Sequence, residues 1–340
     1  MNLHEERYSR FALVREMMET PEIIARFDPS EAADAAAIVR EVDSLFLTGE
    51  GSSRIFPAKN LIYENLKRGG AWHIATDGAR QAHEYDLSRF AVFAASNSGK
   101  TKEVISLFTK LAQEGHPSRL GLTANRGVKL EEVSTRCYHL ACGSENAVAA
   151  TKSVVEQAMF YRALLAFHEN DSSLWNLRED AAKAAREVLE SPIAPSIIER
   201  IAQAPLVYFA GRNNGVAEEL TLKTNEITRK KSDFLEGTYA VHGIEEVMDA
   251  NEVMIVIEPF TAEAEKFQQT LAEKVGLQIV AISAEETIFP TIRIPRVPGY
   301  ETILQLLAGW NLLVEVGVSM GIDLDKPVRA RKIGNEYQPG

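Results

Sequence analysis

Short apolar runs alternate with helical patterns along most of the chain. The first half contains five apolar runs of strand length, each ending at a turn residue, at 44–49, 71–76, 89–96, 119–124 and 137–141. Between them, apolar residues recur at helical spacing, as at Val104, Ile105, Phe108 and Leu111. Strands that alternate with helices are typical of β-α-β units, so the pattern predicts a parallel sheet.

The order of elements then repeats. A polar, Ala-rich helical segment at 169–190 separates two copies of the pattern. In the second copy "PLVYFAGRNNG" matches "SLFLTGEGSS", "NEVMIVIEPF" matches "RFAVFAASNS" and "QIVAISAEE" matches "RLGLTANRG". Long apolar helices, expected at 147–166 and 303–320, close the two copies.

The repeat predicts the fold class and the domain organisation. We expect an α/β protein of two tandem doubly wound parallel-sheet domains, flavodoxin-like in type and of ordinary domain size. A helix is expected from Ala12 to about Phe27. The predicted boundaries are a helical N-terminal segment at 1–34, a first domain at 35–168, a helical linker at 169–196, a second domain at 197–322 and a C-terminal tail at 323–340.

The loops that follow the strands differ between the two copies. In open parallel sheets, ligands bind beyond the carboxyl ends of the strands. The first copy has "TGEGSSR" and "SNSGKT" there, which are rich in glycine and hydroxyl groups. The second copy has "AGRNNG" and "EPFTAE", in which Glu258 and Pro259 disfavour an anion. The first copy is therefore the predicted ligand-binding half.

The segment "SNSGKT", Ser96–Thr101, has the composition of a phosphate-binding turn. It follows a buried-looking strand and opens a helix, so its hydroxyls and the free N–H groups of the helix start converge on one point. The spacing is not that of a Walker A loop, so a single phosphate ester is expected rather than a nucleotide triphosphate. The alternative is that Ser96 or Ser98 only caps the helix. Small residues at 51–53 can supply a second wall, which favours the phosphate interpretation.

The segment "EELTLKTNEIT", 218–228, places an acid, an amine and an acid in one row. Glu219, Lys223 and Glu226 are spaced by four and three residues, so they lie on the same face of a helix. The row is either a solvated face braced by ion pairs or a set of catalytic groups. The phosphate-binding turn elsewhere in the chain favours the catalytic interpretation.

Composition and charge narrow the class of protein. Of 340 residues 45% are apolar, which allows a sizeable core. The net charge of −11 argues against a nucleic acid or an anionic membrane as partner. The N-terminus does not read as a signal peptide, and no apolar run approaches the roughly 20 residues of a membrane span. Cys137 and Cys142 are expected to be reduced thiols, so we expect a cytoplasmic protein without metal or cofactor.

Five motifs in order resemble the sugar isomerase (SIS) family. They are "SNSGKTKEV", "ENAVAATKS", "EELTLKTNEI", the pair His242–Gly243 and "DKPVRARK". The layout, from about 45 to 332, looks like the isomerase half of glucosamine-6-phosphate synthase and its stand-alone relatives. Those relatives include aldose/ketose isomerases, amino-sugar-phosphate deaminases and deglycases of fructosamine phosphates. Because no glutaminase domain precedes the first repeat, this chain alone is not expected to be the glutamine-using synthase.

The resemblance implies roles for individual residues. The family's phosphate- and sugar-binding positions are matched by Ser52, Ser53, Ser96, Asn97, Ser98, Thr101, Val148 and Ala150. Its catalytic positions are matched by Glu219, Lys223, Glu226, the ring-opening histidine His242 and the tail lysine Lys332, which in the synthase can form a Schiff base with the open ketose. Two residues depart from the family pattern: Tyr239 stands where an acid precedes the histidine, and Ile244 stands where a proline follows the glycine.

These residues suit an enzyme that acts on an amino-sugar or ketose phosphate. His242 can open the ring near neutral pH, Glu226 can move a proton between C1 and C2, and Lys223 can stabilise the enediolate. An isomerase or deaminase is favoured over a deglycase, and a non-catalytic sugar-phosphate sensor is the alternative of another class. A homodimer is expected, because the two long apolar helices carry more apolar surface than one sheet face needs, and because in the family the neighbouring subunit often lends the histidine.

Overall fold

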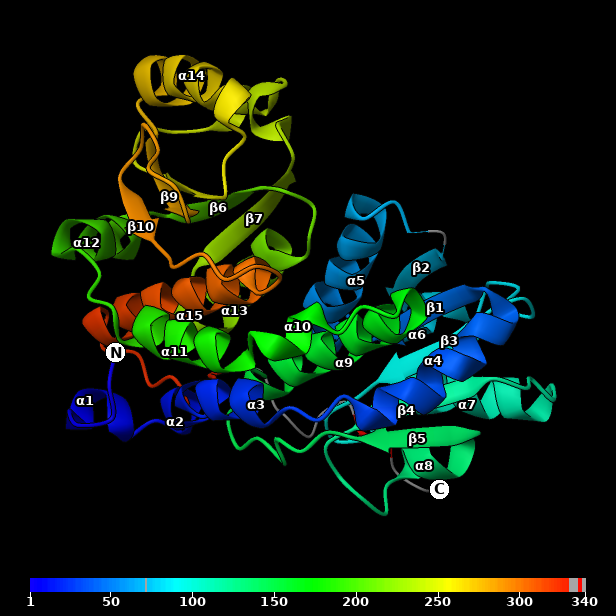
Figure 1. Ribbon diagram of the computed structural model, residues 1–340. Helices are drawn as coiled ribbons and strands as arrows, with labels where there is room; N and C mark the ends of the chain where they lie inside the picture. The colour runs from blue at the N-terminus through cyan, green and yellow to red at the C-terminus, as the bar shows by residue number, and fades with distance from the viewer. Residues whose placement is uncertain (71, 330–335, 338–340) are drawn as a thin grey trace. The chain divides into compact units, whose positions relative to one another are not determined.

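The computed structural model describes residues 1–70, 72–329, 336 and 337 of the chain. It forms two compact units, and each contains one five-stranded parallel sheet (Figure 1). The first-repeat unit comprises Glu22–Asn146, Ala150–Arg178 and the described part of the C-terminal segment. The second-repeat unit comprises Met1–Pro21, Ala147–Ala149 and Glu179–Val328. Each unit is described by itself below.

The sheet of the first-repeat unit has the strand order β2-β1-β3-β4-β5. Its strands are β1 (Ser44–Gly49), β2 (His73–Gly78), β3 (Ala91–Ala95), β4 (Arg119–Thr123) and β5 (Arg136–His139). Its helices are α3 (Thr20–Arg26), α4 (Ser30–Val42), α5 (Ile55–Lys67), α6 (Ala79–Ala82), α7 (Lys102–Gln113), α8 (Lys129–Val133), α9 (Lys152–Glu169) and α10 (Ser173–Asn176). The apolar face of α7 is buried against the sheet, as its helical periodicity predicts.

The sheet of the second-repeat unit has the strand order β10-β9-β8-β6-β7. Its strands are β6 (Leu206–Gly211), β7 (Lys231–Glu236), β8 (Val253–Ile257), β9 (Gln278–Ser283) and β10 (Thr291–Arg293). Its helices are α1 (Glu6–Ser9), α2 (Ala12–Met18), α11 (Arg178–Glu190), α12 (Pro195–Gln203), α13 (Val216–Thr228), α14 (Ala264–Phe267) and α15 (Glu301–Ser319). Helices α2 and α3 replace the single helix expected near the N-terminus.

The two sheets are copies of one another. Read from its other edge, the second order is β7-β6-β8-β9-β10, which matches β2-β1-β3-β4-β5 strand for strand. The register agrees as well, because Leu45 pairs with Ala91 in one sheet and Val207 pairs with Val253 in the other. The predicted α/β fold of two doubly wound parallel-sheet domains is therefore confirmed.

Helix α15 forms the centre of the second-repeat unit. By length and composition it could cross a membrane, but 83% of its apolar window is buried inside the structure, as in the core helix of a globular domain. Helix α13 packs along it, and the two ribbons lie side by side in Figure 1. Gly309 permits this approach, because a Cβ there would lie 2.3 Å from a methyl group of Leu220 on α13.

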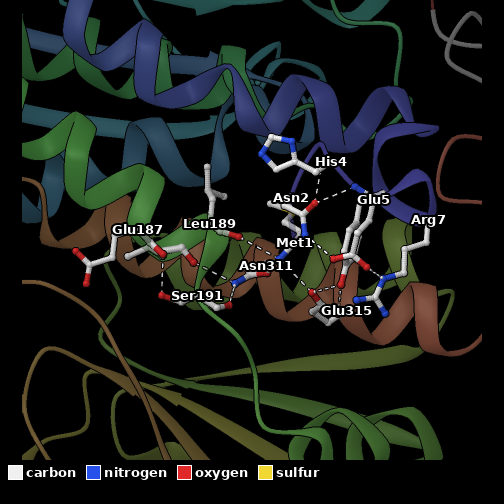
Figure 2. A network of polar contacts seen from close by, with 12 residues as sticks. Met1, Asn2, His4, Glu5, Arg7, Glu187, Leu189, Ser191, Asn311 and Glu315 are labelled. Atoms are coloured by element: carbon white, nitrogen blue, oxygen red, sulfur yellow. Dashed lines mark hydrogen bonds and ion pairs between the residues drawn. The ribbon is translucent and has the colours of Figure 1, made fainter.

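A buried polar network joins the first residue to α11 and α15 (Figure 2). The amine of Met1 donates to Oδ1 of Asn311 at 2.9 Å and lies 3.1 Å from the carboxylate of Glu315. Asn311 is fully buried, and its amide donates to the carbonyls of Val188 and Ser191 at 3.0 and 2.8 Å. One side chain therefore satisfies three buried polar groups.

Replacing Asn311 should destabilise this unit. In Asn311→Ala the carbonyls of Val188 and Ser191 lose this donor, whereas the amine of Met1 keeps Glu315 and the Leu189 carbonyl. Each unmet group costs about 1–3 kcal/mol, so we expect a loss of about 2–6 kcal/mol. Denaturant unfolding at constant m-value measures it. Ser191→Ala is the control, since it removes only an exposed bond to the Glu187 carbonyl and should change stability by less than about 0.5 kcal/mol. Equal stability of the two variants would contradict the prediction.

Candidate functional site

The turn between β3 and α7 is built from its own hydroxyl groups. Ser96 follows the last residue of β3, and 1% of its surface is exposed. Its Oγ accepts the N–H of Gly99 at 3.1 Å and shares a 2.7 Å hydrogen bond with Oγ1 of Thr101. Oγ of Ser98 accepts the N–H of Lys100 at 3.2 Å. We call Ser96–Thr101 the cradle loop.

The cradle loop leaves the start of α7 without a side-chain cap. Thr101 is the N-cap residue, and its side chain makes no capping hydrogen bond. Ser96 and Ser98 bind N–H groups within the loop, so the alternative in which one of them only caps the helix does not describe the structure. An anion at this end of α7 would meet helix N–H groups and a favourable dipole.

A second turn supplies hydroxyl groups at the same edge of the sheet. Ser52 is buried and Ser53 is half-buried in the short turn that follows β1. This turn lies close to the end of β3, because a Cβ on Gly49 would come within 2.9 Å of the Ala95 carbonyl and 3.2 Å of the Ser53 carbonyl. Glycine at 49 therefore allows the two hydroxyl-rich turns to approach each other.

Glu50, in the same loop, is a candidate that the sequence reasoning did not single out. Its carboxylate accepts the N–H of Ala79 at 2.9 Å. Burial raises the pKa of Glu50, the N–H of Arg80 opposes that shift, and the negative charge of Glu103 adds to it. A carboxyl group with a raised pKa at a ligand-binding edge is a candidate proton donor. The only signal in the sequence is its position within "TGEGSSR".

The segment before α9 holds the next predicted binding residues. Val148 and Ala150 are half-buried, whereas Ala147 and Ala149 are buried. The N–H of Ala147 donates to the Glu16 carboxylate at 3.2 Å. The helix expected from residue 147 begins only at Lys152, so Val148 and Ala150 lie on an irregular segment rather than on a helix.

The C-terminal tail contacts the cradle loop. Glu336 forms an isolated antiparallel bridge with Thr101, and the N–H of Tyr337 donates to the Lys100 carbonyl at 2.8 Å. The tail lysine of the family motif, Lys332, lies outside the described residues. The contact places described tail residues beside the hydroxyl groups of the cradle loop.

The acid–amine–acid row lies on α13 in the second-repeat unit. The Nζ of Lys223 lies 2.7 Å from Oε2 of Glu226 and 3.3 Å from Oε1 of Glu219. The side chains of Glu219 and Lys223 are fully buried, whereas Glu226 is 28% exposed. The interpretation of the row as a solvated helix face is therefore wrong.

The row fixes the charge of its amine. Burial alone would lower the pKa of Lys223, but the negative charges of Glu226 and Glu219, together with hydrogen bonds to both, outweigh burial and raise the pKa above its usual value. Lys223 is therefore an ammonium ion at neutral pH. It can stabilise negative charge on a substrate oxygen, but it is not a free amine that could attack a carbonyl carbon.

His242 lies on a surface turn of the same unit. The side chain is exposed, and its Nε2 shares a 3.2 Å hydrogen bond with Oγ1 of Thr238. Tyr239, which replaces the family's acid, is 52% exposed. Glu245 holds the turn, since its carboxylate accepts the N–H of Gly243 at 2.6 Å and Gly243 adopts a φ of +107°.

The second repeat puts a carboxylate where the first has its cradle. The matching registers make Glu258 the counterpart of Ser96, and their N–H groups donate to equivalent carbonyls, of Ile282 at 2.8 Å and of Leu122 at 2.9 Å. The Glu258 carboxylate accepts bonds from Ser283 Oγ and the Ala284 N–H, both at 3.2 Å. The Ser283 hydroxyl and the Ala284 N–H, which could otherwise bind an anionic ligand, are therefore bound to the carboxylate of Glu258.

Cys137 is half-buried, Cys142 is buried, and both are free thiols. Burial raises the pKa of the Cys137 thiol to about 12 and raises that of Cys142 as well. A thiol that keeps its proton is a poor metal ligand. Among the described residues, no group of three or more His, Cys, Asp or Glu side chains is arranged to hold a metal ion.

Comparisons with known proteins agree with this organisation. No protein-family model matches the chain. It is 23% identical over 352 aligned positions to a glutamine–fructose-6-phosphate aminotransferase (isomerizing) of Leifsonia xyli subsp. xyli, covering 93% of this chain and 57% of that protein, so it spans little more than half of the relative's length. The solved structure of a tagatose-6-phosphate ketose/aldose isomerase from Escherichia coli has a TM-score of 0.75 at 16% identity, covering 95% of this chain and 98% of the other.

A further solved structure, a glucosamine-6-phosphate deaminase from Thermotoga maritima, has a TM-score of 0.71 at 18% identity and covers 94% of this chain and 98% of the other. The solved structures confirm the fold. Together with the sequence relative, they support the resemblance to the sugar isomerase family that the five motifs indicate.

Inorganic phosphate should bind at Ser96, Ser98 and Thr101. In Gly99→Ala the new Cβ would lie 2.3 Å from a methyl group of Val128, at a φ of +64° that disfavours alanine, so the loop must shift and affinity should fall by about 10-fold or more. Gly115→Ala is the control, because its φ is +74° but nothing lies within 4 Å. Titration calorimetry compares them. Phosphate bound near 211–215 in a crystal structure would show that the binding half is misassigned.

The buried ion pair should depend on both of its partners. Lys223→Met leaves the Glu219 carboxylate buried without this ammonium and should cost about 3–5 kcal/mol. The double variant Glu219→Met/Lys223→Met should recover most of the loss, because apolar side chains of similar volume can replace a buried pair. Denaturant unfolding of both variants measures this, and a double variant no more stable than Lys223→Met would contradict it.

The same variants give a pH test. A pKa raised in the folded state means that the stabilising contribution of Lys223 is fully present below its unfolded pKa of about 10.4 and is lost as pH rises through the folded value. The stability of the wild type relative to the double variant should therefore fall as the pH rises above about 10.

Proposed function

We propose that the chain is a phosphosugar enzyme that opens the ring of an amino-sugar or ketose phosphate and moves a proton between C1 and C2. The observation that carries the proposal is the row on α13, in which a buried ammonium is held by two carboxylates and only Glu226 reaches solvent. The names of the similar proteins support a phosphosugar enzyme of the isomerase or deaminase kind.

The carboxylate and the ammonium of the row have different tasks in the proposed reaction. Glu226 takes the proton from one carbon, which gives an enediolate. A hydroxyl proton then passes between the oxygens on C1 and C2, and Glu226 returns the first proton to the neighbouring carbon. The Lys223 ammonium stabilises the oxygens that gain charge in this step. Glu219, fully buried, holds the ammonium in place from its other side. This transfer needs no net change in protonation of the enzyme.

The remaining predicted residues bind the substrate and prepare it. The cradle loop binds the phosphate ester together with Ser52 and Ser53, and Val148 and Ala150 contact the sugar. His242 transfers a proton between the anomeric hydroxyl and the ring oxygen, which opens the ring. Lys332 is proposed as the amine for a Schiff base with the open ketose.

Three reactions use the same groups. Aldose/ketose isomerisation, loss of ammonia from C2 and release of an amino acid attached at C1 all begin with ring opening and proton transfer. We favour the isomerase or deaminase over the deglycase because Lys223 and Lys332 match synthase-like positions. A panel of phosphosugars, followed for ammonia, free amino acid and ketose–aldose exchange, distinguishes them. The homodimer and the cytoplasmic location stay predictions.

Glu226→Gln should abolish proton exchange. The substitution keeps size and hydrogen bonding but removes the base, so turnover on every substrate should fall by about 10²- to 10⁴-fold while phosphate binding changes little. In deuterated water the wild type should incorporate deuterium at C1 or C2, and Glu226→Gln should not. Glu218→Gln, on the same helix, is the control. Normal exchange and turnover in Glu226→Gln would mean that the row is only a helix face braced by ion pairs and that another group is the base.

His242→Ala separates ring opening from proton transfer. It should slow turnover of the cyclic sugar phosphate but leave an open-chain analogue, which has no ring to open, much less affected. Equal losses on both substrates would show that His242 has another role.

A further inference from the structure

A buried carboxylate, Glu145, connects the cradle loop with the start of α9. Glu145 follows β5 and is 6% exposed. Its Oε2 accepts bonds from Asn97 Nδ2 and Ser153 Oγ, both at 2.5 Å. Its Oε1 accepts the N–H of Thr151 at 2.7 Å, the Thr151 hydroxyl at 3.2 Å and the N–H of Ser153 at 3.4 Å. These five partners are donors, which suits a carboxylate because it only accepts.

Asn97 is the point at which Glu145 reaches the cradle loop. The Asn97 carbonyl accepts bonds from Thr123 Oγ1 at 2.9 Å and Asn125 Nδ2 at 2.8 Å, which fix its backbone against the end of β4. Its side-chain amide is fixed separately, by Glu145. The backbone and the side chain of Asn97 are therefore both fixed by hydrogen bonds.

We propose that Glu145 is a positioning residue that sets the affinity of the cradle loop for a phosphate group. By binding Asn97, it holds the loop in the conformation that the anion needs, so little ordering remains to be done when phosphate binds. By binding Thr151 and Ser153, it also fixes the start of α9. The inference rests on the phosphate-binding part of the proposed function.

A purely structural role for Glu145 makes a different prediction. A carboxylate that accepts N–H groups in the first turn of a helix stabilises the helix start. Loss of that role would lower stability without changing phosphate affinity once the protein is folded. The bond to Asn97 is the feature that distinguishes the two roles.

Glu156 offers a matched control on α9. It is 4% exposed, and its two oxygens accept the N–H groups of Ala141 at 2.9 Å and Cys142 at 2.7 Å. In Glu145→Gln and in Glu156→Gln, the new side-chain NH2 group faces hydrogen-bond donors that the carboxylate accepted. Both variants should therefore be less stable than the wild type in unfolding experiments. No described hydrogen bond joins Glu156 to the cradle loop.

The experiment is titration of each folded variant with inorganic phosphate, by calorimetry or by ³¹P NMR. Glu145→Gln should raise Kd by at least about 5-fold, roughly 1 kcal/mol, whereas Glu156→Gln should stay within about 2-fold of the wild type. Asn97→Ala should raise Kd at least as much as Glu145→Gln, and adding Glu145→Gln to Asn97→Ala should raise Kd little further, because the Asn97–Glu145 bond is already lost.

Several results would overturn the inference. They are wild-type affinity in Glu145→Gln, equal weakening in Glu156→Gln, or fully additive losses in the double variant. If Glu145→Gln does not fold, Asn97→Ala, at a half-buried position, carries the test from the loop side. Absence of phosphate binding by the wild type would refute this inference together with the cradle. Failure of the Glu226 assignment would not affect it, because binding rather than turnover is measured.

Discussion

The shared carboxyl edge of a parallel sheet is the constraint on which both halves of the chain depend. Because all strands of such a sheet end at one edge, the loops that follow them meet there whatever their sequences. Ser96 and Glu258 occupy equivalent positions at these two edges. In one repeat the hydroxyl groups bind each other and leave a helix start uncapped. In the other, a carboxylate takes the donors. One backbone plan thus gives one turn lined by hydroxyl groups and one turn whose donors bind an internal carboxylate.

Buried charge has two different forms in the second-repeat unit. The Met1 amine lies beside Glu315 and is also bound by an amide oxygen, an arrangement that ties chain segments together. The Lys223 ammonium is instead bound by two carboxylates on its own helix, and one of them, Glu226, is partly exposed. Because desolvation can exceed the Coulombic gain, a buried ion pair is a poor source of stability by itself. An ammonium held next to an accessible carboxylate is therefore consistent with the proposed role of the row in proton transfer.

The fold was predictable where burial imposes a pattern. The central strands are short apolar runs, and β1 occupies its expected range. The edge strands β7 and β10 were not predicted, because β7 has the polar sequence "KSDFLE" and β10 has only three residues. The spacing of the row could be read from the sequence, but its burial could not, because periodicity places residues on one face of a helix without showing whether that face is covered, as it is at Glu219 and Lys223. Glu145 was unpredictable for the same reason: it contacts Asn97, which is 48 residues away in the sequence.

The charge of Lys223 limits the reactions that the row can perform. A protonated amine cannot form a Schiff base, so Lys223 stabilises charge, and the accessible Glu226 is the member of the row that can exchange a proton with a substrate. Isomerisation, deamination and deglycation need these same two tasks. They differ in the group that leaves from C1 or C2, or in whether any group leaves. In the proposed function the row performs the common step, and the side chains that contact the substituents on those two carbons select the reaction that follows.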